Sequence, residues 1–182
     1  MCNVLTVIGL GYVGMPLSQE ACRSGFQVIG LDVSRVVLDG LSAGRSHIDD
    51  LTDDDVAAMQ SVGFTVTDDP SCIASSDVVV ICVPTPLSDE GTPDLGAVVG
   101  AATSIGENLR AGTLVVLEST TYPGTTGDFL RPILEEASGL IAGEDFALAY
   151  SPERIDPGNP TYGFRNTPKV VGGLTPACTE AA

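Results

Sequence analysis

The chain has 182 residues, 43% of them hydrophobic, which is typical of a single folded domain that needs neither disulfides nor metal to bury its core. Its 24 acidic residues outnumber 8 basic ones, and the net charge of −16 argues against a nucleic-acid or anionic-membrane partner. No stretch approaches the ~20 apolar residues of a membrane span, and the first apolar run lacks the features of a secretory leader. We therefore expect a cytoplasmic protein.

Two interpretations of the acidity stay open. A solvated acidic face accounts for clusters such as the aspartates at positions 49, 50 and 53–55. The alternative is adaptation to high salt, in which a negative surface stays hydrated while salt screens its self-repulsion.

The first 32 residues contain the pattern that a dinucleotide-binding turn requires. Residues 4–8 predict a buried strand, and the turn GLGYVG leads into a predicted helix. In this pattern Gly9 permits a tight turn, Gly11 lets the backbone approach a pyrophosphate, and Gly14 lets the helix pack closely on the strand. The N-terminus of that helix offers N–H groups and a partial positive charge to the phosphates.

A second predicted strand, residues 27–31, ends at an acid. Asp32 follows Gly14 by 18 residues. A carboxylate at this place accepts both ribose hydroxyls of an adenosine and repels a 2′-phosphate, which predicts NAD rather than NADP. The alternative is a glycine turn in an α/β domain without a nucleotide, because GxGxxG alone is a common pattern.

The rest of the sequence alternates helices with strands, which predicts one Rossmann-like α/β domain with a doubly wound parallel sheet. The apolar run 77–83 is typical of a parallel strand covered on both faces, and Pro84 ends it. Val170 and Val171 predict a last short strand that ends at Gly172 and Gly173. We also expect helices at 34–42, 53–61, 94–108 and 125–137, and strands at 64–67, 114–117 and 146–150.

Three polar loops that contain proline follow predicted strands. They are VPTP at 83–86, ESTTYPG at 118–124 and SPERIDPG at 151–158. Ordinary turn chemistry explains each loop by itself. Because ligands bind beyond the carboxyl ends of parallel strands, the three loops and the glycine turn together predict one binding cleft.

The cysteines and the single histidine do not suggest a metal site. Five cysteines form no CxxC pair and no zinc-ligand spacing with His47, so we expect reduced thiols and no bound metal. Cys82 is predicted to be a small core residue, and His47 a solvated loop residue. The cysteines are Cys2, Cys22, Cys72, Cys82 and Cys178.

The motifs GLGYVG, ICVPTP, ESTTYPGTT, YSPERIDPGN and PKVVGG, together with Asp32, resemble the N-terminal NAD-binding domain of the UDP-glucose/GDP-mannose dehydrogenase family. SPERIDPG is more similar to the branch acting on UDP-N-acetylhexosamines, such as the UDP-N-acetyl-D-mannosamine and UDP-N-acetyl-D-glucosamine 6-dehydrogenases, than to the UDP-glucose branch. The resemblance covers nearly the whole chain. It implies oxidation of the C6 hydroxyl of a nucleotide sugar to a carboxylate in two NAD-dependent steps, through a thiohemiacetal on a cysteine.

The resemblance also implies a set of cofactor contacts. Tyr12, Val13 and Asp32 contact NAD, in addition to the glycines of the turn. Thr85 of VPTP and Thr120 of EST line the cofactor site.

The same motifs imply which residues contact the substrate and which take part in the reaction. Arg154 and Ile155 contact the nucleotide sugar. Thr120 is a candidate to order a water for the hydrolytic half of the reaction, and Glu153 is a candidate polar contact near the reacting carbon. Arg35 is a candidate to stack on the adenine or reach its ribose, the alternative being an ordinary exposed arginine.

Part of the family pattern has no counterpart in this sequence. No cysteine stands in the motif of the family's nucleophile, and Lys169 belongs to the PKVVGG strand and not to the catalytic lysine motif. We expect residues 1–173 to form the NAD-binding domain and residues 174–182 to begin a truncated central helix, with the central and UDP-binding domains absent. Full-length relatives are expected to form homodimers through that helix. Without its nucleophile, the chain is expected to bind NAD and to be inactive alone.

Two other functions stay open at this level. The chain could be a stand-alone NAD-binding module without dehydrogenase activity, which the sequence downstream in the genome would decide. A different Rossmann oxidoreductase, such as a hydroxyacid dehydrogenase, would have a similar glycine turn but does not account for ESTTYPGTT followed by SPERIDPG.

Overall fold

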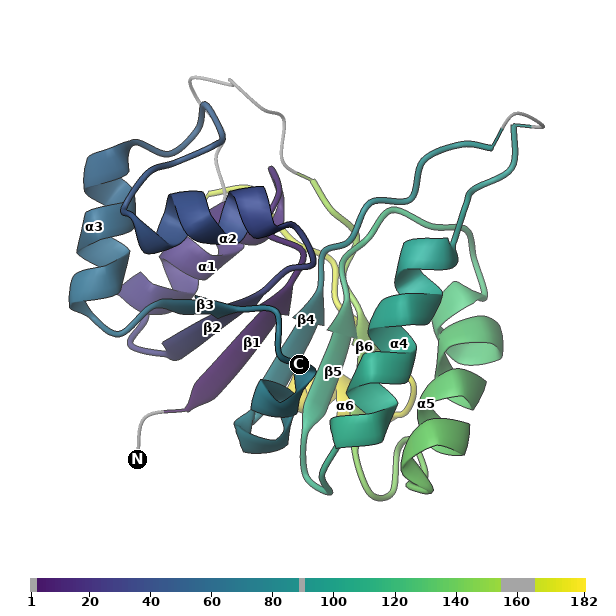
Figure 1. Cartoon of the computed structure of the whole chain (residues 1–182). Coiled ribbons are helices and arrows are strands. Elements are labelled where there is room, and N and C mark those ends of the chain that lie inside the picture. The colour runs from purple at the N-terminus through teal and green to yellow at the C-terminus, as the bar shows by residue number, and fades with distance from the viewer. Residues whose placement is uncertain (1–2, 89–90, 155–165) are drawn as a thin grey trace.

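The predicted strands pair into one seven-stranded sheet, shown in the computed structural model of Figure 1, which describes residues 3–88, 91–154 and 166–182. The strand order is β3-β2-β1-β4-β5-β6-β7. All neighbours are parallel except β6 and β7, which are antiparallel. The strands are β1 (Val4–Ile8), β2 (Gln27–Leu31), β3 (Thr65–Thr67), β4 (Val78–Ile81), β5 (Leu114–Leu117), β6 (Ala147–Tyr150) and β7 (Gly172–Gly173).

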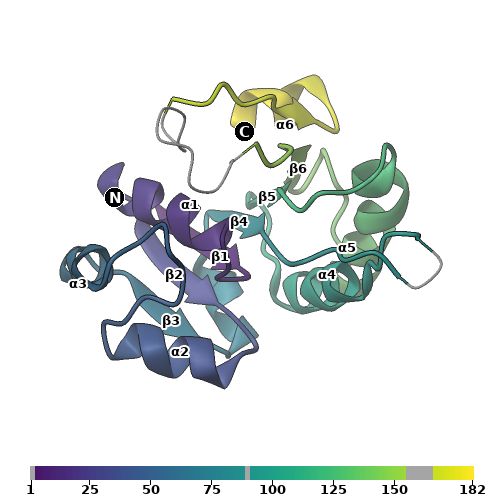
Figure 2. The same ribbon diagram turned by 90° about the horizontal axis from the view of Figure 1, so that it is seen from above.

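Helices cover both faces of this sheet. Figure 2 shows α4 and α5 on one side, with α1 and α6 on the other. The α-helices are α1 (Gly14–Arg23), α2 (Arg35–Ser42), α3 (Asp53–Ser61), α4 (Gly96–Asn108), α5 (Arg131–Ser138) and α6 (Pro176–Ala181). A 3₁₀ helix, η1, spans Pro70–Ser75, and a π-helical turn, η2, spans Thr125–Leu130. In the described part of the chain, no helix combines the length and apolar character that crossing a bilayer would demand.

The hydrophobic core is divided by the sheet into two clusters. Val7 and Val80 point to the cluster that also contains side chains of α1, α2 and α3. Their neighbours Ile8 and Ile81 point to the opposite cluster, which contains side chains of α4 and α5. Because both faces are covered, the strands carry nearly continuous apolar runs, as predicted for a doubly wound sheet.

The predicted elements are present, with differences at their ends. Most boundaries coincide with the prediction, and the others differ by one or two residues, a normal scatter for helix and strand ends. The helix expected at 125–137 instead begins as the π-helical turn, and the α-helix starts at Arg131, where Pro132 lies in its first turn and needs no N–H partner. The sequence prediction missed η1, which Pro70 begins and the Asp69 side chain caps by accepting from the Ser71 N–H.

The last strand was only partly predicted. It contains Gly172 and Gly173 alone, so Lys169, Val170 and Val171 precede it and the prediction that they belong to a strand is wrong. A Cβ atom on Gly173 would lie 2.2 Å from the backbone nitrogen of Thr179. The glycine therefore allows α6 to pack against this edge of the sheet.

Candidate dinucleotide-binding site

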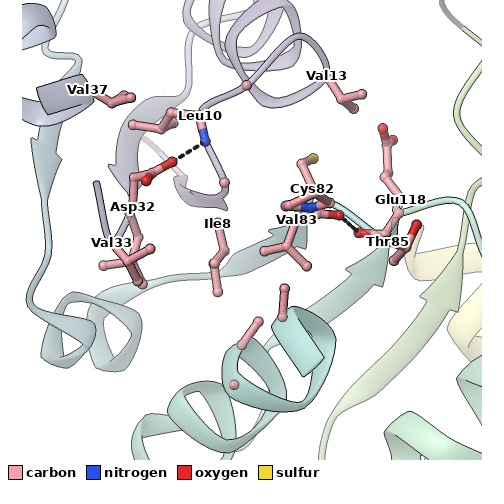
Figure 3. A pocket seen from close by; sticks show the side chains of 18 of the residues that line it. Ile8, Leu10, Val13, Asp32, Val33, Val37, Cys82, Val83, Thr85 and Glu118 are labelled. Atoms are coloured by element: carbon pink, nitrogen blue, oxygen red, sulfur yellow. Dashed lines mark hydrogen bonds between the residues drawn. The ribbon is translucent and has the colours of Figure 1, made fainter. Parts of the chain in front are cut away.

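A pocket of about 940 Å³ opens at the carboxyl ends of β1, β2, β4 and β5 (Figure 3), a size suited to a small-molecule ligand. The order of the strands reverses between β1 and β4, and doubly wound sheets bind ligands at that switch point. Most of the lining comes from the ends of strands and the loops after them. The lining residues are 8–13, 31–33, 82–85 and 118–120, together with Val37, His47, Asp68, Pro70, Ala97, Gly100, Ala101, Ser104 and Glu153.

The three glycines of the GLGYVG turn differ in what surrounds them. Gly9 has a φ of +92°, and a Cβ on it would lie 2.7 Å from the carbonyl oxygen of Cys82. A Cβ on Gly14 would lie 1.9 Å from the carbonyl oxygen of Gly9, so this glycine permits close packing of α1 on β1. A Cβ on Gly11 would meet no atom within 4 Å. The space beside Gly11 is therefore open to a ligand that lies against the backbone.

The N-terminus of α1 faces this open space without a side-chain cap. Val13 is the N-cap residue and its side chain makes no capping hydrogen bond, whereas the Ser34 side chain caps α2 and Thr52 forms a capping box with Asp55 on α3. Uncapped N–H groups at a helix start and the helix dipole favour an anion. Tyr12, half exposed, lines the same part of the pocket.

The backbone of Leu10 is held from both sides. Its N–H donates to Oδ2 of Asp32 over 2.8 Å, and its carbonyl oxygen lies 2.7 Å from Nε2 of His47. Oδ1 of Asp32 accepts from the Ser34 N–H, also over 2.8 Å. Each carboxylate oxygen keeps a further lone pair for a ligand hydroxyl. The predicted ribose acceptor is thus fixed at the pocket by two backbone donors.

His47 has a role that the sequence did not suggest. Its side chain is exposed, as expected for a solvated loop residue, but it also lines the pocket and contacts the glycine turn. The contact joins residues that are 37 positions apart, and only the folded loop between α2 and α3 brings them together.

The end of the pocket beside Asp32 is apolar. Val33 is 98% exposed and Val37 is partly buried, and Figure 3 shows both side chains near Asp32. Arg35 points to the rim, where it forms an ion pair with Asp68, another lining residue. An exposed valine beside an acid is suited to the flat face of a base.

At the other end, the loops after β4 and β5 are joined by side chains. The Thr85 hydroxyl donates to the carbonyl oxygen of Thr120 over 2.6 Å, and the Ser119 hydroxyl donates to the carbonyl oxygen of Val83 over 2.7 Å. VPTP and EST, far apart in the sequence, therefore form one wall, as expected for loops that follow neighbouring parallel strands. Both threonines line the pocket.

Buried ionisable groups lie behind that wall. Glu118 is 5% exposed and forms an ion pair with Lys169. Burial raises the pKa of Glu118, the Lys169 ammonium opposes the shift, and the charge of Glu153 adds to it. Burial also raises the pKa of the Cys82 thiol well above its ordinary value. Cys82 is therefore a neutral core residue, as predicted, and not a thiolate nucleophile.

The substrate residues predicted from SPERIDPG are only partly described. Glu153 lines the pocket, and Arg154 is exposed at the end of the described segment. Ile155 lies outside the described residues. Among the residues that the structure does describe, no group of three or more His, Cys, Asp or Glu side chains is placed to hold a metal ion.

The strand order, the glycine turn at the switch point and the acid after β2 define a dinucleotide-binding domain of the Rossmann class. The family model of the UDP-glucose/GDP-mannose dehydrogenase family, NAD binding domain, matches residues 3–182. The chain belongs to this family, and its cofactor is NAD. The family match also removes the hydroxyacid-dehydrogenase alternative.

Similar proteins include several sugar-nucleotide dehydrogenases. The UDP-N-acetyl-D-glucosamine 6-dehydrogenase of Pseudomonas aeruginosa is 38% identical over 97% of this chain and 41% of its own length. The UDP-N-acetyl-D-mannosamine dehydrogenase of Pyrococcus horikoshii is 35% identical over 98% of this chain and 43% of its own length. A crystal structure of NDP-N-acetyl-D-galactosaminuronic acid dehydrogenase from Methanosarcina mazei superposes with a TM-score of 0.90 at 34% identity, covering 98% of this chain and 40% of that chain. The chain therefore spans about two fifths of the length of these relatives.

Proposed function

We propose that this chain is the cofactor half of a nucleotide-sugar 6-dehydrogenase that oxidises the C6 hydroxyl of a UDP-N-acetylhexosamine to a carboxylate in two NAD-dependent steps. The observation that carries the proposal is the pocket at the switch point, open beside Gly11 and bordered by Asp32. Residues 1–173 are the NAD-binding unit, and residues 174–182, which contain α6, begin the central helix of the longer relatives.

The residues present fit NAD along the whole pocket. The uncapped N-terminus of α1 and the open space at Gly11 receive the pyrophosphate, Asp32 accepts the adenosine ribose hydroxyls, and Val33 packs on the adenine. Gly9, Gly14, Tyr12 and Val13 shape this half of the site, and Arg35 borders it. NAD, when bound, supplies the hydride acceptor.

The far half of the pocket holds the nicotinamide end. Thr85 and Thr120 are fixed to each other there by their hydrogen bond. The hydroxyl of Thr85 is used in that bond, which leaves the hydroxyl of Thr120 as the candidate to order a water for the hydrolytic step. Glu153 lines the same end and is the candidate polar contact to the reacting carbon, with Arg154 and Ile155 next to it in the chain for the nucleotide sugar.

The described cysteines near the pocket do not include the catalytic nucleophile. Cys82 is the only lining cysteine of the described residues, and its thiol is buried and neutral. Covalent catalysis needs a thiolate. We therefore expect the chain to bind NAD and to leave a nucleotide sugar unoxidised when it acts alone.

A chimera tests the proposed function. The 182-residue chain is joined to the remaining three fifths of the Pseudomonas aeruginosa relative, and NADH absorbance is followed with UDP-N-acetyl-D-glucosamine and UDP-N-acetyl-D-mannosamine. We expect two NADH per sugar from a folded chimera and none from the chain alone. Gly11→Val in the chimera is the matched control and removes NADH formation. NADH produced by the chain alone, or a folded, NAD-binding chimera inactive on every UDP-sugar, contradicts the proposal.

A further inference from the structure

Glu118 has a carboxylate oxygen that the fold leaves unused. Lys169 pairs with Oε1, while Oε2 is buried and has no hydrogen-bond partner among the described residues. The side chain is 6% exposed, and the residue lines the pocket. A buried carboxylate oxygen without a donor is costly, so such an atom at a pocket wall points to a donor supplied by a ligand.

The position of Glu118 limits what that donor is. Glu118 is the first residue after β5, on the same loop as Thr120. The glycine turn lies between this loop and Asp32. In Figure 3 its side chain rises from the end of β5 toward the side of the pocket where Val13 lies. A carboxylate repels a pyrophosphate, which excludes the phosphates as its partner.

The charges nearby are also consistent with a cationic, N–H-bearing ligand group. Lys169 forms an ion pair with Glu118, and Glu153 lines the same pocket as Glu118. Two carboxylates and one ammonium leave a net negative charge when all three are ionised. The nicotinamide ring of oxidised NAD is positively charged and carries an amide N–H donor, while the adenine amine lies at the Asp32 end.

We infer that Glu118, held by Lys169, is a cofactor-contacting residue whose Oε2 accepts a hydrogen bond from the carboxamide N–H of nicotinamide. This inference rests on the proposed placement of NAD in the pocket. Lys169 acts as a positioning residue: it occupies Oε1 and turns the other oxygen to the ligand. The pair also ties the segment before β7 to the end of β5, which makes the nicotinamide end of the site depend on a residue 51 positions away.

Calorimetric titration with three ligands tests this contact. The ligands are NAD, its 3-acetylpyridine analogue, which lacks the amide N–H, and ADP-ribose, which lacks the nicotinamide. We expect the wild-type chain to bind NAD about tenfold more tightly than the analogue, the difference expected for a hydrogen bond to a charged acceptor. In Glu118→Gln the amide keeps the shape and pairs its oxygen with Lys169, so NAD and the analogue bind with nearly equal affinity. ADP-ribose binds both proteins equally.

Two controls separate the possible failures. Glu107→Gln changes an exposed carboxylate of α4 and leaves all three affinities unchanged. If the folded wild-type chain binds neither NAD nor ADP-ribose, the proposed function itself fails. If it binds both but does not distinguish NAD from the analogue, the function stands and the Glu118 contact is overturned, and this comparison needs no variant. Equal loss of ADP-ribose and NAD affinity in Glu118→Gln also overturns it, because a structural defect would act on both.

Discussion

At the scale of single residues, the backbone of Leu10 is the centre of the site. Its N–H is held by Asp32 and its carbonyl oxygen by His47, so contacts within the protein already fix the glycine turn. A preformed turn reduces the entropy that binding must overcome. We therefore propose two tasks for Asp32: it fixes the turn, and it presents its remaining lone pairs to a ribose.

Replacing Asp32 tests both tasks. We expect Asp32→Ala to weaken NAD binding by about 1–3 kcal/mol, because a charged hydrogen-bond acceptor is lost. Without the carboxylate, discrimination against NADP also falls. Calorimetry measures both affinities, and Asp39→Ala on the exposed face of α2 is the control that leaves them unchanged. Unchanged NAD affinity in a folded Asp32→Ala protein would show that the ribose does not lie at Asp32.

Gly11 and Gly14 give opposite results when a side chain is added. We expect Gly11→Val to remove NAD binding, because the new side chain enters the empty space that the pyrophosphate needs. We expect its melting temperature to be unchanged, because the φ of residue 11 is not in the left-handed region and the added Cβ meets no protein atom. Gly14→Ala lowers stability by about 1–3 kcal/mol, the usual cost of overpacking, because its Cβ overlaps the carbonyl oxygen of Gly9. Thermal melts and NAD titrations of both variants check this. A Gly11→Val protein that still binds NAD contradicts the placement of the pyrophosphate.

At the scale of elements, polar side chains align the strands that carry the site. Oδ2 of Asp77 accepts from the Val4 N–H over 2.9 Å, and its Oδ1 pairs with Arg110 over 2.6 Å. Asp77 thus joins the start of β1, the start of β4 and the loop before β5. The carboxyl ends of the same strands form the pocket, so their register sets its shape.

The Asp77 contacts predict a pH dependence of stability. The Val4 N–H first, and then Arg110, lower the pKa of Asp77 in the folded chain. A lowered folded-state pKa gives stability above the unfolded-state pKa of about 3.9 that is lost as the pH falls through the folded-state value. We expect Asp77→Asn to be less stable than wild type in urea at pH 7, with the difference shrinking in acid. Asp39→Asn is the control, and a difference that is the same at both pH values contradicts this origin.

The elements also show which parts of the fold the sequence predicted. β1, α1, β2 and their glycine turn were predicted because local spacing determines them, and VPTP and EST were placed on one wall because parallel strands share an edge. η1, the π-helical turn and the short β7 depend on tertiary contacts, such as the packing of α6 on Gly173. The His47–Leu10 contact and the Glu118–Lys169 pair join positions far apart in the sequence. No local pattern in a single sequence predicts such contacts.

At the scale of the whole molecule, the charge of −16 is the dominant property. Self-repulsion among 24 acidic side chains opposes the compact state, and salt screens it as the Debye length falls from about 10 Å at 0.1 M to about 3 Å at 1 M. A surface of this kind is consistent with the high-salt interpretation of the sequence, which stays a prediction.

A melting series in KCl tests the high-salt interpretation. We expect the melting temperature to rise between 0.1 M and 1 M salt, and to rise less in the Asp49→Asn, Asp50→Asn double variant, in which two exposed charges are removed. Equimolar NaCl gives the same rise if screening is the cause. A melting temperature that does not respond to molar KCl argues against adaptation to high salt.

The central claim is that this family member holds NAD in the pocket between its glycine turn and the loops after β4 and β5. Calorimetric titration of the 182-residue chain with NAD and, separately, with NADP tests it most directly. The account predicts saturable one-to-one binding of NAD and much weaker binding of NADP, because Asp32 repels a 2′-phosphate. A folded chain that binds neither dinucleotide, or that binds NADP as tightly as NAD, would contradict it.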